Sequence, residues 1–361
     1  MIKAHKKFKI PTMRRSSRIY LTHLNKSKSE TLKQFLFKCH DVTQYFVDLF
    51  WQRSDKSVTL ADLPTVHRGR NRFKITTRLA QALAKQAKET IKNRSNKRKP
   101  RLRKHTTTLY YHFVKIEKFK GFFDYAVNLI GSGAPVMTVP VKSTKHLNWM
   151  LKRDWIIGKS IRLGIDEKGI FIDFILEKPV PPKRQTGRVL GMDNNYKNGL
   201  VFSDGRRFGK EIYDRIQKFN RRQKHTHEEC KSMLYKILNR IDFSGVRMIV
   251  IEDLKKVKQY TRGKFSRLFN RRLSHWLYAC IADWLSQHCE ELGIQLEKKS
   301  PWKTSQRCSV CGRWDRRNRK GSEFKCVHCG FSDDADHNAA VNLEFLGLAG
   351  VYGLRYLKSS K

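Results

Sequence analysis

The chain has 361 residues, and 76 lysines and arginines against 32 aspartates and glutamates give it a formal net charge of +44. Its hydrophobic content of 39% excludes a disordered chain on composition, and its length allows two or three domains. A surface this positive repels itself unless a polyanion covers it. Nucleic acid is the natural partner, because each neutralised phosphate releases condensed counterions.

Membrane association is the alternative for a basic chain, and the sequence gives no support for it. We find no apolar run of about 18 residues, no basic amphipathic helix and no lipid motif. The basic start "MIKAHKKFKIP" is not followed by the apolar segment of a signal peptide. We therefore expect a cytoplasmic, nucleoid-associated protein with no membrane partner. Four scattered cysteines are interpreted as reduced thiols, namely Cys39, Cys230, Cys280 and Cys289.

The N-terminal part predicts a short strand followed by helices. An alternating pattern indicates a strand within residues 1–10. Apolar periodicity predicts a helix over 27–53, and Ser27 and Glu30 have the spacing of a capping box at its start. The same periodicity predicts a second helix over 77–93.

A basic segment, residues 94–104, follows this second helix, and seven of its eleven residues are lysine or arginine. A solvated tail is one interpretation of such a run. In a chain this positive we favour a phosphate-binding segment. Its candidate nucleic-acid contacts are Arg94, Lys97, Arg98, Lys99, Arg101, Arg103 and Lys104.

Period-two patterns replace the helical ones from about residue 105 to 180 and predict several strands separated by turns. The strands are expected in "TTTLYYHFVKIEK", "APVMTVPVK", "SIRLGIDEKG" and "IFIDFILEK". The proline-rich stretch "PVPPKRQTG", residues 179–187, then predicts a linker and a domain boundary.

The second half begins with a predicted three-stranded meander over residues 188–209. Its two turns are Asn198-Gly199 and Asp204-Gly205, pairs that tolerate the positive φ of tight hairpins. Further elements are predicted in the order helix 211–241, apolar strand 246–253, helix 265–293 ended by Gly293, strand 294–299, and a helix beginning near Asp336. This is the element order of a ribonuclease H-like α/β fold.

Four cysteines in two C-x-x-C pairs interrupt that order. The spacing Cys308-x-x-Cys311, fourteen residues, Cys326-x-x-Cys329 is typical of a zinc ribbon. Disulfides and free thiols are the alternatives, and a reducing compartment disfavours disulfides. Four thiolates leave no open position, so we expect one structural Zn²⁺. The basic loop between the pairs adds three candidate nucleic-acid contacts, Arg313, Arg316 and Arg317.

Three acids lie where carboxylates are rarely buried without a partner. Asp193 ends the first meander strand, Glu252 ends the apolar strand, and Asp336 begins the last helix. Each alone could be a cap or an ion-pair partner. As a set they predict two Mg²⁺ or Mn²⁺ ions about 4 Å apart that hydrolyse a phosphodiester. Asp334 is expected to be a helix cap or an auxiliary ligand, and Asp253 to point to the opposite side of its strand.

These motifs together resemble the TnpB family of transposon-encoded, RNA-guided nucleases, which are related to miniature type V CRISPR effectors. The matching stretches are "GMDNNYKNGLVF", "IVIEDL", "SPWKTSQRCSVCG…FKCVHCGF" and "DADHNAAVNL", all within residues 188–346. The resemblance implies that Asp193, Glu252 and Asp336 are the catalytic carboxylates of a RuvC nuclease domain, and that the four cysteines bind zinc. One departure stands out, since the family commonly has Asp-x-Gly where this chain has "DNN".

The resemblance also implies the organisation of the first half and the partners. The expected domains are a wedge (an oligonucleotide-binding-like β-barrel) over residues 1–10 and 104–186, a helical recognition lobe over 11–103, a RuvC-like nuclease over 187–300 and 332–361, and a zinc ribbon over 301–331 that binds target nucleic acid. The expected partners are a guide RNA and a double-stranded DNA target beside a short flanking motif, bound by a monomer.

Three alternatives remain open at this point. A miniature type V CRISPR effector would share the chemistry and take a CRISPR RNA as its guide. An RNA-guided repressor that does not cut would keep the binding and lose the acids, which are intact here. A metal-dependent nuclease or transposase without a guide would not account for the basic, barrel-like first half.

Overall fold

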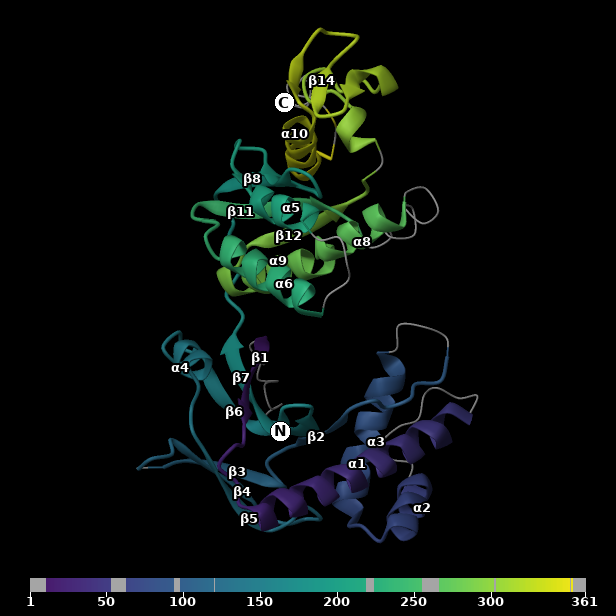
Figure 1. Ribbon diagram of the computed structural model, residues 1–361, viewed down its shortest axis with the longest axis vertical. Helices are drawn as coiled ribbons and strands as arrows, with labels where there is room; N and C mark the ends of the chain where they lie inside the picture. Colours follow the sequence, from purple (N-terminus) through teal and green to yellow (C-terminus); the bar gives the residue numbers. More distant parts are fainter. Residues whose placement is uncertain are drawn as a thin grey trace, which may run out of the picture. The chain divides into compact units, whose positions relative to one another are not determined.

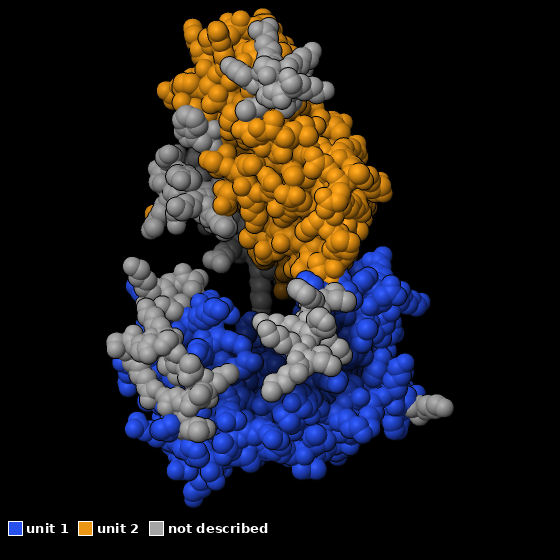
Figure 2. Space-filling model, turned by 180° about the vertical axis from the view of Figure 1, so that it is seen from behind, with its two compact units in different colours: residues 1–179 blue, residues 180–361 orange. Residues whose placement is uncertain are grey.

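The computed structural model describes residues 11–52, 63–93, 98–119, 121–218, 224–254, 266–301, 303–350 and 352. The chain divides into two compact units, residues 1–179 and 180–361, which Figure 2 colours separately. The division falls inside the proline-rich segment 179–187. Within the described residues, no helix combines the length and the apolar character needed to cross a membrane.

The first unit contains two antiparallel sheets (Figure 1). The four-stranded sheet has the order β1 (Thr12–Tyr20), β7 (Gly169–Pro179), β6 (Ile156–Asp166) and β2 (His105–Leu109). The three-stranded sheet has the order β3 (Val114–Lys118), β4 (Tyr125–Leu129) and β5 (Met137–Val141). Closure of these strands into the expected barrel stays a prediction.

The described residues of the first unit also form helices α1 to α4, and α1 packs against α3. Their bounds are α1 Lys26–Gln52, α2 Leu63–Phe73, α3 Thr77–Lys92 and α4 Lys145–Leu151. Helix α1 begins one residue before Ser27, because Asn25 rather than Ser27 accepts the Lys28 N–H (2.9 Å). The capping box expected at Ser27 and Glu30 is therefore wrong, although the helix itself is confirmed.

Several boundaries of the first unit differ from the sequence prediction. The strand expected within residues 1–10 lies outside the described residues, whereas Thr12–Tyr20, assigned to the helical lobe 11–103, is a strand that pairs with β7 along its whole length. Helices α2 and α4 and strand β4 were not predicted. The single strand expected over 106–118 is two strands, β2 and β3, with a turn between them.

The second unit is built on a five-stranded sheet of order β10-β9-β8-β11-β12. The strands are β8 (Arg188–Asn195), β9 (Gly199–Phe202), β10 (Arg207–Phe208), β11 (Val246–Glu252) and β12 (Gln295–Lys299). The first three form the predicted antiparallel meander, and β11 runs parallel to both β8 and β12. The predicted α/β class of this half is thus confirmed.

The helices of this unit are α5 (Lys210–Gln217), α6 (Lys224–Leu238), α8 (Arg267–His275), α9 (Tyr278–Leu292) and α10 (Ala335–Leu348). The single helix expected over 265–293 is wrong, since it breaks into α8 and α9 at Trp276, with Leu277 at φ 16° and ψ 44° outside helical geometry. The helix expected over 211–241 is likewise two helices. Gly293 ends α9 in the left-handed conformation, as predicted (φ 68°).

The two faces of the sheet carry different partners, because side chains alternate along each strand. On one face, Leu190 and Met192 of β8 join Ile249 and Ile251 of β11 in a large core that includes residues of α5, α6 and α9. On the other face, residues of alternate parity pack against α10; these are Val189, Met248 and Val250, which meet Leu343 and Leu346. Asp193 and Glu252 lie on this second face, and Asn195 follows Asp193 on it at the end of β8.

The cysteine-rich insertion between β12 and α10 forms a small three-stranded antiparallel sheet. Its strands are β13 (Arg319–Lys320), β14 (Glu323–Lys325) and β15 (Ser332–Asp334). Strand β15 leads directly into α10. Phe324 and Ala335 are fully buried against the cysteines, so the insertion and the start of the helix share one core.

Candidate metal centres

The strand register places Asp193 and Glu252 side by side. Met192 of β8 is the partner of Ile251 in the parallel β11, so the next residue of each strand, Asp193 and Glu252, occupies an adjacent position on the α10 face. Asp193 is buried with 8% of its surface exposed, and Glu252 is partly buried. Two carboxylates therefore share one end of the sheet.

Asp336 reaches the same end because α10 lies directly on β8. Gly191 makes this possible, since a Cβ atom built there would lie only 1.8 Å from the carbonyl oxygen of Ala340. Asp193 is two residues beyond Gly191 on the same face, and Asp336 is about one helical turn before Ala340. These two steps run toward the same end of the sheet, so they bring Asp336 next to the pair of strand carboxylates.

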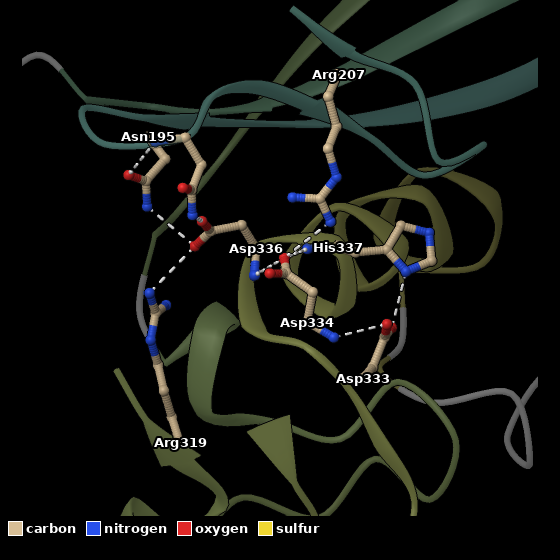
Figure 3. Close-up of polar contacts among 8 residues, drawn as sticks. Asn195, Arg207, Arg319, Asp333, Asp334, Asp336 and His337 are labelled. Atoms are coloured by element: carbon tan, nitrogen blue, oxygen red, sulfur yellow. Dashed lines mark hydrogen bonds and ion pairs between the residues drawn. The ribbon is translucent and has the colours of Figure 1, made fainter. Parts of the chain in front are cut away.

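Asp336 is completely buried, and both of its carboxylate oxygens accept hydrogen bonds (Figure 3). Its Oδ1 accepts hydrogen bonds from Asn195 Nδ2 (2.9 Å) and Arg319 Nη2 (3.1 Å). Its Oδ2 accepts a hydrogen bond from Asn198 Nδ2 (2.5 Å). Asn195 is the last residue of β8, Asn198 lies in the turn between β8 and β9, and Arg319 comes from β13 of the ribbon, so three separate elements meet at this carboxylate.

The neighbouring acids serve the start of α10. Asp334 caps the helix, which is one of the two roles predicted for this residue. Its carboxylate accepts hydrogen bonds from the backbone N–H groups of Asp336 and His337. Arg207 of β10 pairs with Asp334 (3.1 Å), and Asp333 contacts His337 Nδ1 (2.8 Å). Figure 3 shows these contacts on the side of the helix away from Arg319. They fix the backbone that carries Asp336.

The electrostatics of the site favour additional positive charge. Burial raises the pKa of Asp193 well above its ordinary value, and the charges of Glu252 and Asp336 raise it further. Burial also raises the pKa of Glu252 to about 7. Arg319 opposes both shifts, because its charge lowers the pKa of Asp193 and of Glu252. The buried Thr304 hydroxyl also lowers the pKa of Glu252, although this hydroxyl lies outside hydrogen-bond geometry. One guanidinium does not balance three carboxylates.

The spacing of the acids is wider than that of a single-ion site. Among the residues that the structure describes, the four cysteines are the one set of three or more possible ligands whose atoms all lie within 4.8 Å of one another. Asp336 is turned toward its asparagine and arginine partners. Two ions about 4 Å apart take ligands over a wider span than one ion. Three carboxylates with uncompensated charge therefore fit a pair of oxygen-preferring divalent ions.

The cysteines form the second centre and fit zinc. Thiolates about 2.3 Å from a tetrahedral ion lie about 3.8 Å from one another, and the Sγ atoms are 3.6 Å apart in both Cys308–Cys329 and Cys311–Cys326. Gly312 and Gly330 follow the two pairs at φ 72° and 75° and close the tight turns. Although burial opposes ionisation, the Phe331 N–H and the neighbouring thiols lower the pKa of Cys329. None of the eight cysteines is in a disulfide.

Two buried asparagines of α10 tie the helix to this centre. Asn338 donates to the Arg307 carbonyl (2.8 Å) and accepts from the Ser309 N–H (3.0 Å). Asn342 donates to the carbonyls of Thr304 (3.0 Å) and Arg307 (2.7 Å). The segment that enters the first C-x-x-C pair is thus fastened along the helix that carries Asp336.

The predicted nucleic-acid contacts lie in both units. Arg94 and Lys97 are outside the described residues. Arg313, Arg316 and Arg317 are exposed on the ribbon, and Arg317 pairs with Asp315 (2.8 Å). The exposed residues of the basic segment that the structure describes are Arg98, Lys99, Arg101, Arg103 and Lys104.

The basic segment is held in place rather than solvated as a tail. Gln44 of α1 accepts from the Leu102 N–H (2.9 Å), and Asp48 pairs with Lys99 (3.0 Å). Beside it lies a hollow of about 980 Å³ between α3, the basic segment and strands β2 and β6. Its basic lining consists of Arg98, Lys99, Arg101, Arg103 and Arg162.

Sequence reasoning missed several residues of the carboxylate site. Arg319 was one of five basic residues in a loop, and nothing in the sequence separates it from Arg317. Asn195 carried a signal, because "DNN" departs from the usual Asp-x-Gly, but the signal did not name its partner, and Asn198 was predicted only as part of a turn. Asn338 and Asn342 sit in the motif "DADHNAAVNL", where only their buried neighbours reveal their role.

The chain is similar to a known protein family and to several curated proteins. Residues 278–343 match the model of the family described as Cas12f1-like, TNB domain. A CRISPR-associated endodeoxyribonuclease Cas12f1 from Sulfoacidibacillus thermotolerans is 38% identical over 100 residues, which are 27% of this chain and 22% of the relative. The TnpB-like protein aq_aa05 of Aquifex aeolicus is 28% identical over 203 residues, 54% of this chain and 57% of the relative.

A solved structure extends the likeness to the whole fold. The cryo-EM structure of a Cas12f1–sgRNA–target DNA complex matches 89% of this chain and 83% of its own with a TM-score of 0.54, at 16% sequence identity. The predicted resemblance to the TnpB family and to miniature type V effectors is confirmed by these comparisons. In particular, this chain is similar to TnpB-like proteins and to Cas12f1. The chain spans between a fifth and three fifths of the length of these two curated relatives.

Proposed function

We propose that this protein is an RNA-guided DNA endonuclease of the TnpB type. It hydrolyses phosphodiesters of a guide-matched DNA target beside a short flanking motif. The observation that carries the proposal is the convergence of Asp193, Glu252 and Asp336 at one end of the α10 face of the sheet. Relatives named as endodeoxyribonucleases support the reaction class.

The three carboxylates would hold two Mg²⁺ or Mn²⁺ ions. When bound, such a pair activates a water for attack and stabilises the leaving oxygen. Asp193 and Glu252 offer oxygens from adjacent rigid strands, which limits their movement. Arg319 supplies the one positive side chain of the described site and is placed to contact a phosphate bound beside Asp336. A hydrolysis of this kind leaves a 5′-phosphate and a 3′-hydroxyl.

The zinc ribbon fixes the edge of this site. Its one structural Zn²⁺, held by Cys308, Cys311, Cys326 and Cys329, keeps β13 in place and so orients Arg319. The exposed ribbon residues Arg313, Arg316 and Arg317 are then positioned to contact the phosphates of a target strand.

The first unit is the proposed guide-binding part. The hollow lined by Arg101, Arg103 and Arg162 offers several guanidinium groups to a phosphate backbone. Glu89 and Thr90 lie in the same lining and can accept hydrogen bonds from 2′-hydroxyl groups, which distinguish RNA from DNA. Base pairing by the guide would then read the target sequence.

The test is a cleavage assay on the protein purified with co-expressed RNA from beside its gene. The bound RNA is sequenced, and a matching DNA library with randomised flanks is cut in the presence of Mg²⁺. Asp193→Ala and Glu252→Ala should abolish cutting and leave guided DNA binding nearly intact. Asp253→Ala is the matched control, because Asp253 is the neighbouring acid just beyond β11, and it should cut normally.

Three outcomes would redirect the proposal. Guided binding without cutting by the wild type would favour the RNA-guided repressor. Equal cutting by wild type and Asp193→Ala would remove Asp193 from the catalytic set. A bound RNA that derives from a CRISPR array, instead of a transposon end, would make the protein a miniature type V effector with the same chemistry.

A further inference from the structure

We propose that Asn195 and Asn198 form an amide clamp that positions Asp336 and sets the affinity of the carboxylate site for its divalent ions. The inference rests on the proposed function and adds two positioning residues to it. The clamp is defined by the two side-chain amides that donate to Asp336, one to each carboxylate oxygen.

The geometry leaves Asp336 little freedom. The amide of Asn195 holds Oδ1 at 2.9 Å, and the amide of Asn198 holds Oδ2 at 2.5 Å. A carboxylate held at both oxygens cannot rotate about its terminal bond without breaking one of these contacts. Because Asp336 is completely buried, no water replaces a lost donor easily.

The clamp is itself fixed by the backbone of the β8–β9 turn. The side-chain oxygen of Asn195 accepts hydrogen bonds from the N–H groups of Lys197 (2.7 Å) and Asn198 (3.3 Å). This choice of partners assigns the amide orientation, since backbone N–H groups need an acceptor and the carboxylate needs a donor. The turn then closes at Gly199, whose φ of +80° suits glycine. The backbone of this turn therefore holds the amide donor of Asn195 in its orientation toward Asp336.

Counting acceptor positions shows what the clamp leaves for a cation. A carboxylate has about four lone-pair sites, two on each oxygen. Asn195 and Arg319 occupy Oδ1 together, whereas Asn198 alone occupies Oδ2. One acceptor position on Oδ2 stays available, so the clamp leaves Asp336 a single preferred oxygen for a divalent ion.

Glycine, which the resembling family commonly has at the position of Asn195, has no side chain to donate to Asp336. The neighbouring Asn194 of β8 has a different role, because its Oδ1 accepts the indole N–H of the buried Trp276 (2.7 Å). Two adjacent asparagines thus serve the core and the carboxylate site respectively.

Manganese binding to the full-length, zinc-loaded protein with its RNA tests the clamp without relying on cutting. Mn²⁺ is titrated alone and followed by calorimetry and electron paramagnetic resonance. Removing a partner that orients a metal ligand typically weakens binding 10- to 100-fold. We expect Asn195→Gly and Asn198→Ala each to weaken Mn²⁺ binding by about tenfold and to raise the Mg²⁺ concentration for half-maximal cutting similarly.

The matched control is Asn194→Ala. It leaves the Trp276 N–H without its acceptor, so it should lower the melting temperature but leave Mn²⁺ binding unchanged. Unchanged Mn²⁺ binding in both clamp variants, at normal zinc content, would overturn the inference. If wild type and Asp336→Asn bind Mn²⁺ equally, then the carboxylate site itself fails, and the proposed function fails with it.

Discussion

Arg319 Nη2 lies 3.1 Å from Oδ1 of Asp336, and this contact joins the first strand of the zinc ribbon to the first turn of α10. The two residues are seventeen positions apart, with the second C-x-x-C pair between them. The cysteine cluster, which fits a zinc ion, therefore has a structural role beside the acids. The small sheet that it supports holds the Arg319 guanidinium against carboxylates that repel one another.

The first prediction concerns this pair. Arg319→Ala removes the cation that opposes the raised pKa values of Asp193 and Glu252. We expect cutting to fall at least about tenfold, because a buried charge loses its partner, while guided DNA binding stays within about twofold. The measurement is single-turnover cleavage with saturating RNA and Mg²⁺.

Lys325→Ala is the control for Arg319→Ala. Lys325 lies in β14 of the same ribbon and is exposed. We expect a small change, since a single exposed charge contributes little. Equal losses in the two variants would mean that general positive charge, and not the Asp336 contact, is what cutting requires.

The second prediction tests the approach of α10 to β8. Gly191→Ala places a methyl group 1.8 Å from the Ala340 carbonyl oxygen, so the helix must move. We expect a loss of at least about 3 kcal/mol in the free energy of unfolding, at the high end for overpacking, together with loss of cutting. Gly205→Ala is the control, because nothing lies near its Cβ position and its φ of +86° costs only about 1 kcal/mol. Similar unfolding curves for the two variants would contradict the close approach.

The third prediction concerns pH. Folding raises the pKa of Glu252 to about 7 and that of Asp193 above its ordinary value, so the metal-free fold prefers both groups protonated. Protonation of these two groups stabilises the fold fully when the pH is below their pKa in the unfolded chain, about 4. This stabilisation is lost as the pH rises through about 7, the pKa of Glu252 in the folded chain. We expect Asp193→Asn to raise the melting temperature of the metal-free protein above pH 7, and Mg²⁺ to stabilise the wild type more than the variant. A destabilised variant at pH 8 would contradict the sign.

Much of this architecture followed from local sequence, and the rest depended on tertiary contacts. The turns at Gly199 and Gly205, the stop at Gly293 and the cysteine spacing are local rules, and the structure confirms them. The break at Trp276 escaped prediction because apolar periodicity continues through it. Arg319 escaped because its role depends on which arginine the ribbon turns toward Asp336, which no spacing rule encodes.

The first unit likewise contains elements that local sequence predicted and elements that depend on tertiary contacts. The helices α1 and α3 were predicted from periodicity, whereas the short, basic α2 lacks a strong apolar face and was missed. The capping box at Ser27 failed because Asn25 is a competing cap two residues earlier. Strand β1 was misassigned because its sequence is rich in arginine and serine, and it is a strand only by pairing with β7.

The fourth prediction concerns removal of zinc. Cys326→Ser leaves three thiolates and should release the metal, because structural zinc sites derive their stability from a complete ligand set. The ribbon then unfolds and Arg319 leaves Asp336, so we expect loss of zinc by elemental analysis and a cutting rate at least about tenfold lower. Cys280→Ser is the control, since this half-buried thiol lies outside the cluster. Full activity in zinc-free protein would show that the ribbon does not orient the site.

The fifth prediction addresses the hollow of the first unit. Arg101→Ala with Arg103→Ala removes two guanidinium groups from its lining. If each neutralises one phosphate, the slope of log affinity for the co-purified RNA against log salt should fall by about 2. Arg14→Ala with Lys115→Ala is the charge-matched control, because both residues pair with glutamates (Glu177 and Glu117) outside the hollow. Nitrocellulose filter binding between low and physiological salt gives both slopes. Equal slopes in the two double variants would place the RNA elsewhere on this basic chain, since net charge alone would then govern its binding.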